Sequence, residues 1–288
     1  MSGLKTKIVD DCWETGYIWA MSLTQDYLAL LGVRQLRPRT SPFDPGYSPV
    51  EVASHVSQSG HLMATLKISM ACWQITSDAA VREKITAARD AGVEVTTGGG
   101  PFEVAVAQKQ LPAYLDLCAV LGFQRIECGE GFTKLDLEPA AIVEEAGRRG
   151  LAVQYEIGPK HEGPMTRATI EELLDRSARW LDAGAVQIVV EARESAVGVG
   201  LFDASGALDA ELAHAFADRF GLDALTFEAP TKPSQFAFLS LFGPEVGLSN
   251  VRLEELLRVE IYRRGLHSDA FSQANLAPPS PGEESRAR

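Results

Sequence analysis

Short runs of apolar and β-branched residues recur along the chain, each followed by a loop and by a segment of helical periodicity that ends near glycine. Seven runs are clear, and they begin at residues 61, 93, 125, 152, 186, 224 and 246. This spacing is close to the ~30 residues of one βα unit, so it predicts parallel strands joined by helices. The predicted strands are 61–69, 93–97, 125–129, 152–158, 186–193, 224–229 and 246–251.

An eighth strand is predicted over residues 36–44, where the pattern is weaker. Pro38 and Pro42 fall in this run, and proline cannot donate a ladder hydrogen bond, so the pairing must be short or irregular. The continuously apolar run at 187–190 is typical of a sheet covered on both faces. A doubly wound sheet and a barrel both satisfy these observations. Eight βα units without a reversal favour the α/β class and a (β/α)8, or TIM, barrel.

The βα repeat divides the chain into three predicted segments. Residues 1–35 are helical in pattern and lie outside the repeat, so we predict an N-terminal helical extension. Residues 36–271 form the predicted barrel and catalytic domain. Residues 272–288 lack apolar periodicity and contain Pro278, Pro279 and Pro281, which predicts a disordered tail.

Composition narrows the range of partners. The formal net charge of −12 argues against a nucleic-acid partner, because such proteins gather Lys and Arg to neutralise phosphates. No apolar stretch approaches the ~20 residues that span a bilayer, and we find no secretory signal, so a cytoplasmic protein without a membrane partner is predicted. Four cysteines without a paired spacing predict reduced thiols. A small anion in a pocket stays compatible with the net charge.

Charged residues concentrate at the carboxyl ends of the predicted strands, which form the catalytic face of a (β/α)8 enzyme. Their glutamates would supply a set of oxygen ligands, which suits a hard cation such as Mg²⁺. Internal ion pairs with the lysine or arginine of the set are the alternative for any single glutamate. The residues are Lys67, Glu127, Glu156, Glu191, Arg193 and Glu228, of which the four glutamates are the candidate metal ligands.

Two loop lysines and two glycine runs extend the candidate site. Lys160 and Lys232 follow strand ends, where a lysine can bind a phosphate or donate a proton, although a solvated loop lysine is the alternative. Gly98 and Gly99 precede a helix, and free amides there can bind an anion. Glycines 198 and 200, just after Ser195, predict a second group of anion-binding amides.

Several motifs follow one another in the order of the predicted strands, and the chain thereby resembles the phosphosulfolactate synthase family over roughly residues 37–270. The resemblance implies a (β/α)8 lyase that adds sulfite to phosphoenolpyruvate with Mg²⁺ in sulfonate biosynthesis, and a homo-oligomer. The motifs are Gly98-Gly99 with Phe102-Glu103, Gly122-Phe123 with Glu127, Glu156-Ile157-Gly158 with Lys160, Asp182-Ala183-Gly184 before Glu191 and Arg193, Phe227-Glu228-Ala229-Pro230, Leu248-Ser249-Asn250-Val251 and Arg263-Arg264-Gly265-Leu266.

The resemblance also implies roles for single residues. Lys160 would be the general acid that protonates C2, and Lys67 and Arg193 would bind substrate anions as further catalytic residues. Glu156, Glu191 and Glu228 would surround the metal. The remaining candidates bind substrate in this hypothesis, and they are Gly98, Gly99, Ser195, Lys232, Asn250 and His267.

Departures from the family pattern leave the reaction open. Pro45 stands where the family has lysine, and His267 where it has arginine, so two positive charges are missing. Met70 and Gly247 also differ from the pattern. The leading hypothesis is sulfite addition to phosphoenolpyruvate. One alternative is a related enzyme that uses a different nucleophile or a different phosphorylated acid. Another is a non-catalytic, stress-associated or interaction homologue.

Overall fold

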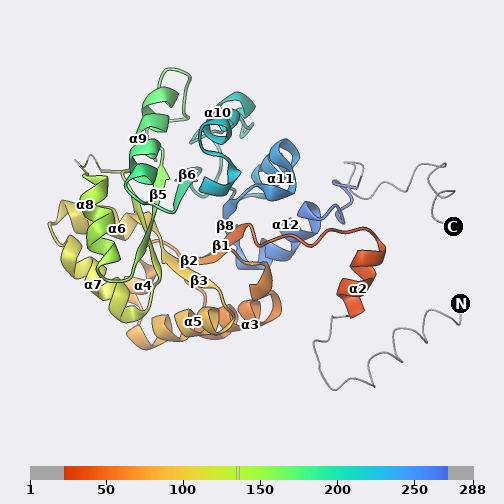
Figure 1. Cartoon of the computed structure of the whole chain (residues 1–288), viewed down its shortest axis with the longest axis horizontal. Coiled ribbons are helices and arrows are strands. Elements are labelled where there is room, and N and C mark those ends of the chain that lie inside the picture. The colour runs from red at the N-terminus through yellow and green to blue at the C-terminus, as the bar shows by residue number, and fades with distance from the viewer. Residues whose placement is uncertain (1–22, 134, 136, 272–288) are drawn as a thin grey trace, which may run out of the picture. The chain divides into compact units, whose positions relative to one another are not determined.

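Eight parallel strands close into a barrel in the computed structural model, which describes residues 23–133, 135 and 137–271. Neighbours in the barrel follow the order of the chain, and helices lie outside the ring of strands (Figure 1). The prediction of a (β/α)8 barrel is therefore confirmed. The strands are β1 (Thr40–Asp44), β2 (Thr65–Ile68), β3 (Glu94–Thr97), β4 (Arg125–Gly129), β5 (Ala152–Ile157), β6 (Gln187–Val190), β7 (Leu225–Glu228) and β8 (Leu248–Arg252).

The described helices from residue 49 onward connect or follow these strands and cover the barrel. Helix α5 begins after Ser77, whose side chain accepts a hydrogen bond from the Ala80 N–H at 3.3 Å, and this N-cap stabilises its first turn. The helices are α2 (Leu23–Leu30), α3 (Pro49–Ser59), α4 (Cys72–Ile75), α5 (Asp78–Asp90), α6 (Gly99–Ala107), α7 (Leu111–Leu121), α8 (Pro139–Gly147), α9 (Ile170–Asp182), α10 (Ala210–Phe220), α11 (Lys232–Phe242) and α12 (Leu256–Arg263).

Burial on both faces explains the apolar character of the strands. Ile188, Val189 and Val190 of β6 are at most 2% exposed, as expected for strands enclosed by helices. The Trp180 ring of α9 stacks on Tyr155 of β5 at a centroid distance of 4.4 Å. This aromatic contact holds α9 against β5.

Every strand except β4 differs from its predicted bounds by one residue or more, and β1 and β2, which begin four residues later than predicted, do so beside local irregularities. The strand predicted from residue 61 begins only at Thr65, because Gly60–Leu62 form a 3-10 turn that continues α3. Strand β1 is present, and its pairing with β8 shifts register between Ser41 and Pro42. Proline lacks the N–H that a regular ladder needs, so this shift accommodates Pro42.

The contacts divide the chain into two units. One unit is the barrel, Leu36–Arg263, and the described residues of the other are 23–35 and 264–271. Within the second unit, α2 has no buried residue. Most of the predicted N-terminal extension, residues 1–22, and the predicted disordered tail, residues 272–288, lie outside the described residues. Assembly into a homo-oligomer stays a prediction.

Two other sequence-based predictions concern the membrane and the thiols. None of the helices in the described part of the chain has the length and apolar character that a bilayer span requires. Cys72, Cys118 and Cys128 are free, while Cys12 lies outside the described residues.

A buried ion pair holds the carboxyl end of β1. The Lys84 ammonium lies 2.6 Å from the Asp44 carboxylate, and both side chains are at most 6% exposed. The second Asp44 oxygen accepts the N–H groups of Gly46 and Tyr47 at 2.7 and 2.6 Å. Asp44 therefore fixes the turn after β1.

We expect Lys84→Met to lower the free energy of unfolding by about 3 kcal/mol, because it leaves the Asp44 carboxylate buried without its cation. Urea unfolding monitored by circular dichroism measures the change. Lys109→Met removes an exposed lysine and serves as the matched control, with no measurable effect expected. A loss below about 1 kcal/mol for Lys84→Met would contradict the role of the pair.

Candidate active site

A cavity of about 700 Å³ opens at the carboxyl ends of the strands. Most of the candidate site residues line it, and they come from β2 and from the strand ends or loops of the units that follow. The candidates on its wall are Lys67, Gly98, Gly99, Glu127, Glu156, Lys160, Glu191, Arg193, Ser195, Glu228 and Asn250. The structure thus brings together residues that lie far apart in the sequence.

Three candidates of the barrel unit, Lys232, Gly198 and Gly200, do not lie on this wall. Lys232 is the first residue of α11, and its Nζ lies 5.0 Å from the centroid of the Phe236 ring. His267 belongs to the second unit, where its Nδ1 accepts the Asp269 N–H at 3.1 Å. The roles of Lys232 and His267 in substrate binding stay predictions.

Lys67 of β2 forms the buried floor of the cavity and is only 3% exposed. Its Nζ lies 3.1 Å from Glu127 Oε1 and 3.2 Å from Glu228 Oε1. Burial alone would lower the pKa of Lys67, but the Glu127 and Glu228 carboxylates outweigh it and raise the pKa, so the ammonium stays charged.

Glu127 of β4 has partners for both of its oxygens. Beside Lys67, its Oε1 accepts the Gly99 N–H at 2.9 Å and its Oε2 accepts the Gln154 amide at 2.8 Å. An internal ion pair, the alternative that the sequence left open for any glutamate, therefore describes Glu127. Its predicted role as a metal ligand has no support in this geometry.

Lys160 brings a second ammonium into the cavity. Its Nζ lies 2.7 Å from Glu156 Oε2 and 3.1 Å from Glu191 Oε2, and its side chain is 19% exposed. Burial lowers the pKa of Lys160, but the two carboxylates outweigh this effect and raise it. The Lys160 ammonium is therefore charged and paired with two carboxylates on the cavity wall, which differs from the alternative of a solvated loop lysine.

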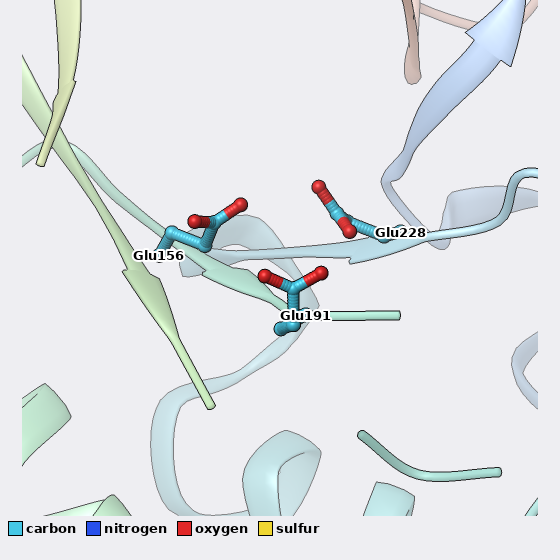
Figure 2. A group of neighbouring side chains, drawn as sticks. All are labelled: Glu156, Glu191 and Glu228. Atoms are coloured by element: carbon cyan, nitrogen blue, oxygen red, sulfur yellow. The ribbon is translucent and has the colours of Figure 1, made fainter. Parts of the chain in front are cut away.

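Glu156 of β5, Glu191 just after β6 and Glu228 of β7 point their carboxylates toward one another (Figure 2). One oxygen from each lies within 4.8 Å of the others, and all three residues are buried. Burial has the largest effect on the pKa of Glu156 and raises it. The Lys160 charge lowers this pKa and the Glu127 charge raises it, and the result is a pKa of about 7. Burial and the two neighbouring carboxylates raise the pKa of Glu191, whereas Lys67 and Lys160 outweigh burial at Glu228 and lower its pKa.

The three carboxylates fit a divalent cation. Glu156 Oε2 and Glu191 Oε2 are buried and accept no hydrogen bond from the described residues, although Lys160 Nζ lies at ion-pair distance from both. Lys160 thus balances part of the charge of these two oxygens, while each oxygen keeps lone pairs that a cation could share. Carboxylate oxygens are the ligands that a hard cation such as Mg²⁺ prefers.

The chain after β6 bends sharply around Glu228. Glu228 Oε2 accepts the N–H groups of Ala192 and Arg193 at 2.9 and 3.0 Å, and the Arg193 N–H also donates to Glu191 Oε1. Arg193 has a φ of 55°, and Met70 and Asn250 on the same cavity wall also have positive φ. Such strained backbone is concentrated at functional sites in proteins.

The glycine runs do not present free amides as the sequence predicted. Gly98 and Gly99 line the cavity, but their N–H groups donate to Ile68 O at 3.2 Å and to Glu127 Oε1. In the second run, the Gly198 N–H donates to Asp203 O at 2.8 Å. A Cβ at Gly200 would lie 1.8 Å from the Glu191 carbonyl oxygen, so this glycine allows a close backbone approach instead of forming an anion site.

Apolar residues at the cavity mouth were not predicted from the sequence. Met70, Val104 and Phe132 line the cavity and are 48%, 52% and 46% exposed. No periodicity marks them, because two lie in loops and Val104 lies on a helix whose other residues are mostly apolar.

Comparison with known proteins agrees with this geometry. The profile of the family described as (2R)-phospho-3-sulfolactate synthase (ComA) matches residues 34–269, a range that includes every candidate site residue. The chain belongs to the (2R)-phospho-3-sulfolactate synthase family. The resemblance inferred from the motifs is confirmed, and the chain is an enzyme of the lyase type.

Curated relatives carry the same family name. The phosphosulfolactate synthase of Methanocaldococcus jannaschii is 31% identical over 238 residues, which cover 82% of this chain and 95% of the relative. The phosphosulfolactate synthase of Methanothermobacter thermautotrophicus is 28% identical, covering 82% of this chain and 92% of the relative. That of Bacillus subtilis is 28% identical, covering 85% and 98%.

A solved structure supports the fold alone. The truncated 3-deoxy-D-arabino-heptulosonate 7-phosphate synthase of Thermotoga maritima has a TM-score of 0.50 and 13% identity. The match covers 83% of the chain described here and 89% of the Thermotoga maritima chain.

The raised pKa of Glu156 predicts how the cation-free protein responds to pH. Between pH 4.5, the ordinary value, and about 7, the folded protein retains a proton on Glu156 that the unfolded chain releases. Stability should therefore fall as the pH rises through this window, and Glu191 acts in the same direction. Glu156→Gln cannot titrate, so its unfolding midpoint should depend less on pH than that of the wild type. Thermal unfolding in chelator at several pH values measures both; equal slopes would contradict the shift.

Proposed function

We propose that this chain catalyses the addition of sulfite to phosphoenolpyruvate, with Mg²⁺ bound and Lys160 as the general acid. The observation that supports this proposal is the placement of the Lys160 ammonium, 2.7 Å from Glu156 and 3.1 Å from Glu191, within a cluster of carboxylates that fits a divalent cation. Membership of the (2R)-phospho-3-sulfolactate synthase family supports the choice of substrates.

Glu156, Glu191 and Glu228 would hold the cation. Their buried position excludes most solvent, which strengthens each electrostatic interaction in the cavity. When bound, Mg²⁺ supplies a Lewis acid that stabilises negative charge on the substrate carboxylate.

The proton is the contribution of Lys160. The sulfur of sulfite forms a bond to C3 of phosphoenolpyruvate, and the π electrons of the C2–C3 double bond move to C2. Lys160 donates its proton to C2, which completes phosphosulfolactate and leaves a neutral amine that solvent reprotonates. The cavity is partly open, so the exposed part of the Lys160 side chain can regain this proton.

Lys67 and Arg193 have different positions in this proposal. Lys67 lies beneath the carboxylates and offsets the charge of Glu127 and Glu228. Arg193 lies at the mouth, where its Nη1 donates to the Lys160 carbonyl oxygen at 3.1 Å. Its remaining donors can contact an incoming anion.

A second candidate function is addition of a larger organic nucleophile to the same acceptor. The apolar residues Met70, Val104 and Phe132 at the mouth favour it, because sulfite offers no apolar surface to them. Competition between sulfite and organic sulfinates or thiols in one assay would rank the two nucleophiles.

We expect Lys160→Ala to lower kcat for sulfite addition about 10³-fold, since the general acid is lost. Phosphorus NMR of phosphoenolpyruvate incubated with sulfite and Mg²⁺ measures product formation. Lys109→Gly is the control, because Lys109 is exposed and has a positive φ that glycine tolerates. Activity of Lys160→Ala within tenfold of the wild type would refute its role.

Metal binding can be tested without turnover. Glu156→Gln and Glu191→Gln should each weaken Mn²⁺ or Mg²⁺ binding at least about tenfold, because each removes an oxygen of the cluster. Glu127→Gln should weaken it less than either of these variants, since Glu127 contacts Lys67, Gln154 and Gly99 and offers no free oxygen to the cluster. Calorimetry and the electron paramagnetic resonance of Mn²⁺ give the affinities. Equal losses in all three variants would instead place Glu127 among the ligands.

A further inference from the structure

A buried glutamate outside the metal cluster holds the loop that follows β4. Glu103 of α6 is 0% exposed. Its Oε1 accepts the Gly131 N–H at 3.0 Å, and its Oε2 accepts the N–H groups of Phe132 and Thr133 at 3.0 and 2.9 Å. The Thr133 hydroxyl donates to the same oxygen at 2.6 Å. One carboxylate thus satisfies three consecutive amides.

No lysine or arginine in the described part of the chain forms an ion pair with Glu103. A buried carboxylate without a cation is costly unless hydrogen-bond donors replace its water. Consecutive backbone amides do so here, in the manner of an anion-binding nest. The conformation of the loop therefore depends on the Glu103 carboxylate that its amides surround.

The same loop contacts Lys160 in two ways. The Lys160 N–H donates to the Gly131 carbonyl oxygen at 2.8 Å. A Cβ at Gly131 would lie 2.3 Å from Cε, 2.7 Å from Cγ and 2.8 Å from Cδ of Lys160. The methylene chain of the lysine therefore lies directly on the Gly131 backbone.

We propose that Glu103 is a positioning residue for Lys160, which acts by fixing Gly131 as the surface along which the lysine side chain extends toward the carboxylates. This proposal rests on the proposed function for the role of Lys160 in proton transfer. The three residues belong to successive βα units. Glu103 lies on α6 after β3, Gly131 in the loop after β4, and Lys160 in the loop after β5. Misplacing a reacting group by about 1 Å can cost about 10²-fold in rate, so such a connection is large enough to matter.

Two variants separate the links of this connection. Glu103→Gln keeps the shape of the side chain but replaces one acceptor oxygen with an NH₂ group, which cannot accept the N–H groups of the loop. The loop should therefore be released. Gly131→Ala leaves the Glu103 bonds in place and pushes against the Lys160 stem. Gly131 does not have a positive φ, so an alanine there causes no backbone strain. The added methyl group is opposed only by its contact with the Lys160 side chain. Asp203→Asn is the control, because Asp203 is exposed and accepts the Ser205 and Ala207 amides of a loop away from the cavity wall.

Hydrogen exchange and labelling test the connection without turnover. In Glu103→Gln, the amides of 131–133 should exchange at least about tenfold faster than in the wild type, whereas Gly131→Ala and Asp203→Asn should not accelerate them. The rate of Lys160 acylation, relative to Lys109, should change more than about threefold in Glu103→Gln and Gly131→Ala, and not in Asp203→Asn. Unchanged labelling in both variants would overturn the proposal, even if sulfite addition proves to be the wrong reaction.

Kinetics distinguish positioning from a general loss of structure. Glu103→Gln and Gly131→Ala should lower kcat at least about tenfold while the KM for phosphoenolpyruvate and the Mg²⁺ affinity change less than about threefold. A kcat equal to that of the wild type in Glu103→Gln, or equal losses in kcat and Mg²⁺ affinity, would overturn the positioning role. An inactive wild type would refute the proposed function alone, since exchange and labelling would still decide the role of Glu103.

Discussion

The burial of four carboxylates at one end of the barrel is the constraint on which the site depends. Glu127, Glu156, Glu191 and Glu228 are each at most 4% exposed, and removing such charges from water costs several kcal/mol apiece. Lys67 and Lys160 offset only part of this charge, so two negative charges remain if every group is ionised. The raised pKa values of Glu156 and Glu191 show how the protein accommodates the surplus, because a bound proton can replace a cation.

The barrel explains why such a costly arrangement forms at all. Parallel pairing of consecutive strands brings the carboxyl ends of β4, β5, β6 and β7 to the same edge, so each glutamate is placed by the backbone pairing of the strands and not by its own side chain. The two ammonium groups then divide the carboxylates into pairs. Lys67 binds Glu127 and Glu228 below, and Lys160 binds Glu156 and Glu191 nearer the opening. Glu127 becomes structural through this division, while the other three keep oxygens that face one another.

The sequence predicted the barrel and the shared location of the charged residues, because strand period and helix termination are local properties. It could not separate Glu127, whose two oxygens are both occupied within the protein, from the three glutamates whose oxygens face one another, since this depends on which oxygens Gln154 and the Gly99 amide reach across neighbouring strands. The glycine runs were misleading for the same reason, because their amides are used within the protein. Glu103 gave no signal of its role: a single glutamate on an apolar helix reveals neither its burial nor the amides that surround it.

The charge balance also constrains the order of events in the proposed reaction. Phosphoenolpyruvate and sulfite are both anions, and the cavity floor carries a surplus of negative charge when its glutamates are ionised. Arg193 and Glu194 at the mouth offset each other in charge, so the entrance supplies no net attraction. Anions would therefore enter against repulsion unless the glutamates are first neutralised by protons or by a divalent cation. Protonation would also remove the ligands that the cation needs. In the proposed reaction a divalent cation would therefore bind before the anions, at oxygens that Lys160 Nζ also contacts.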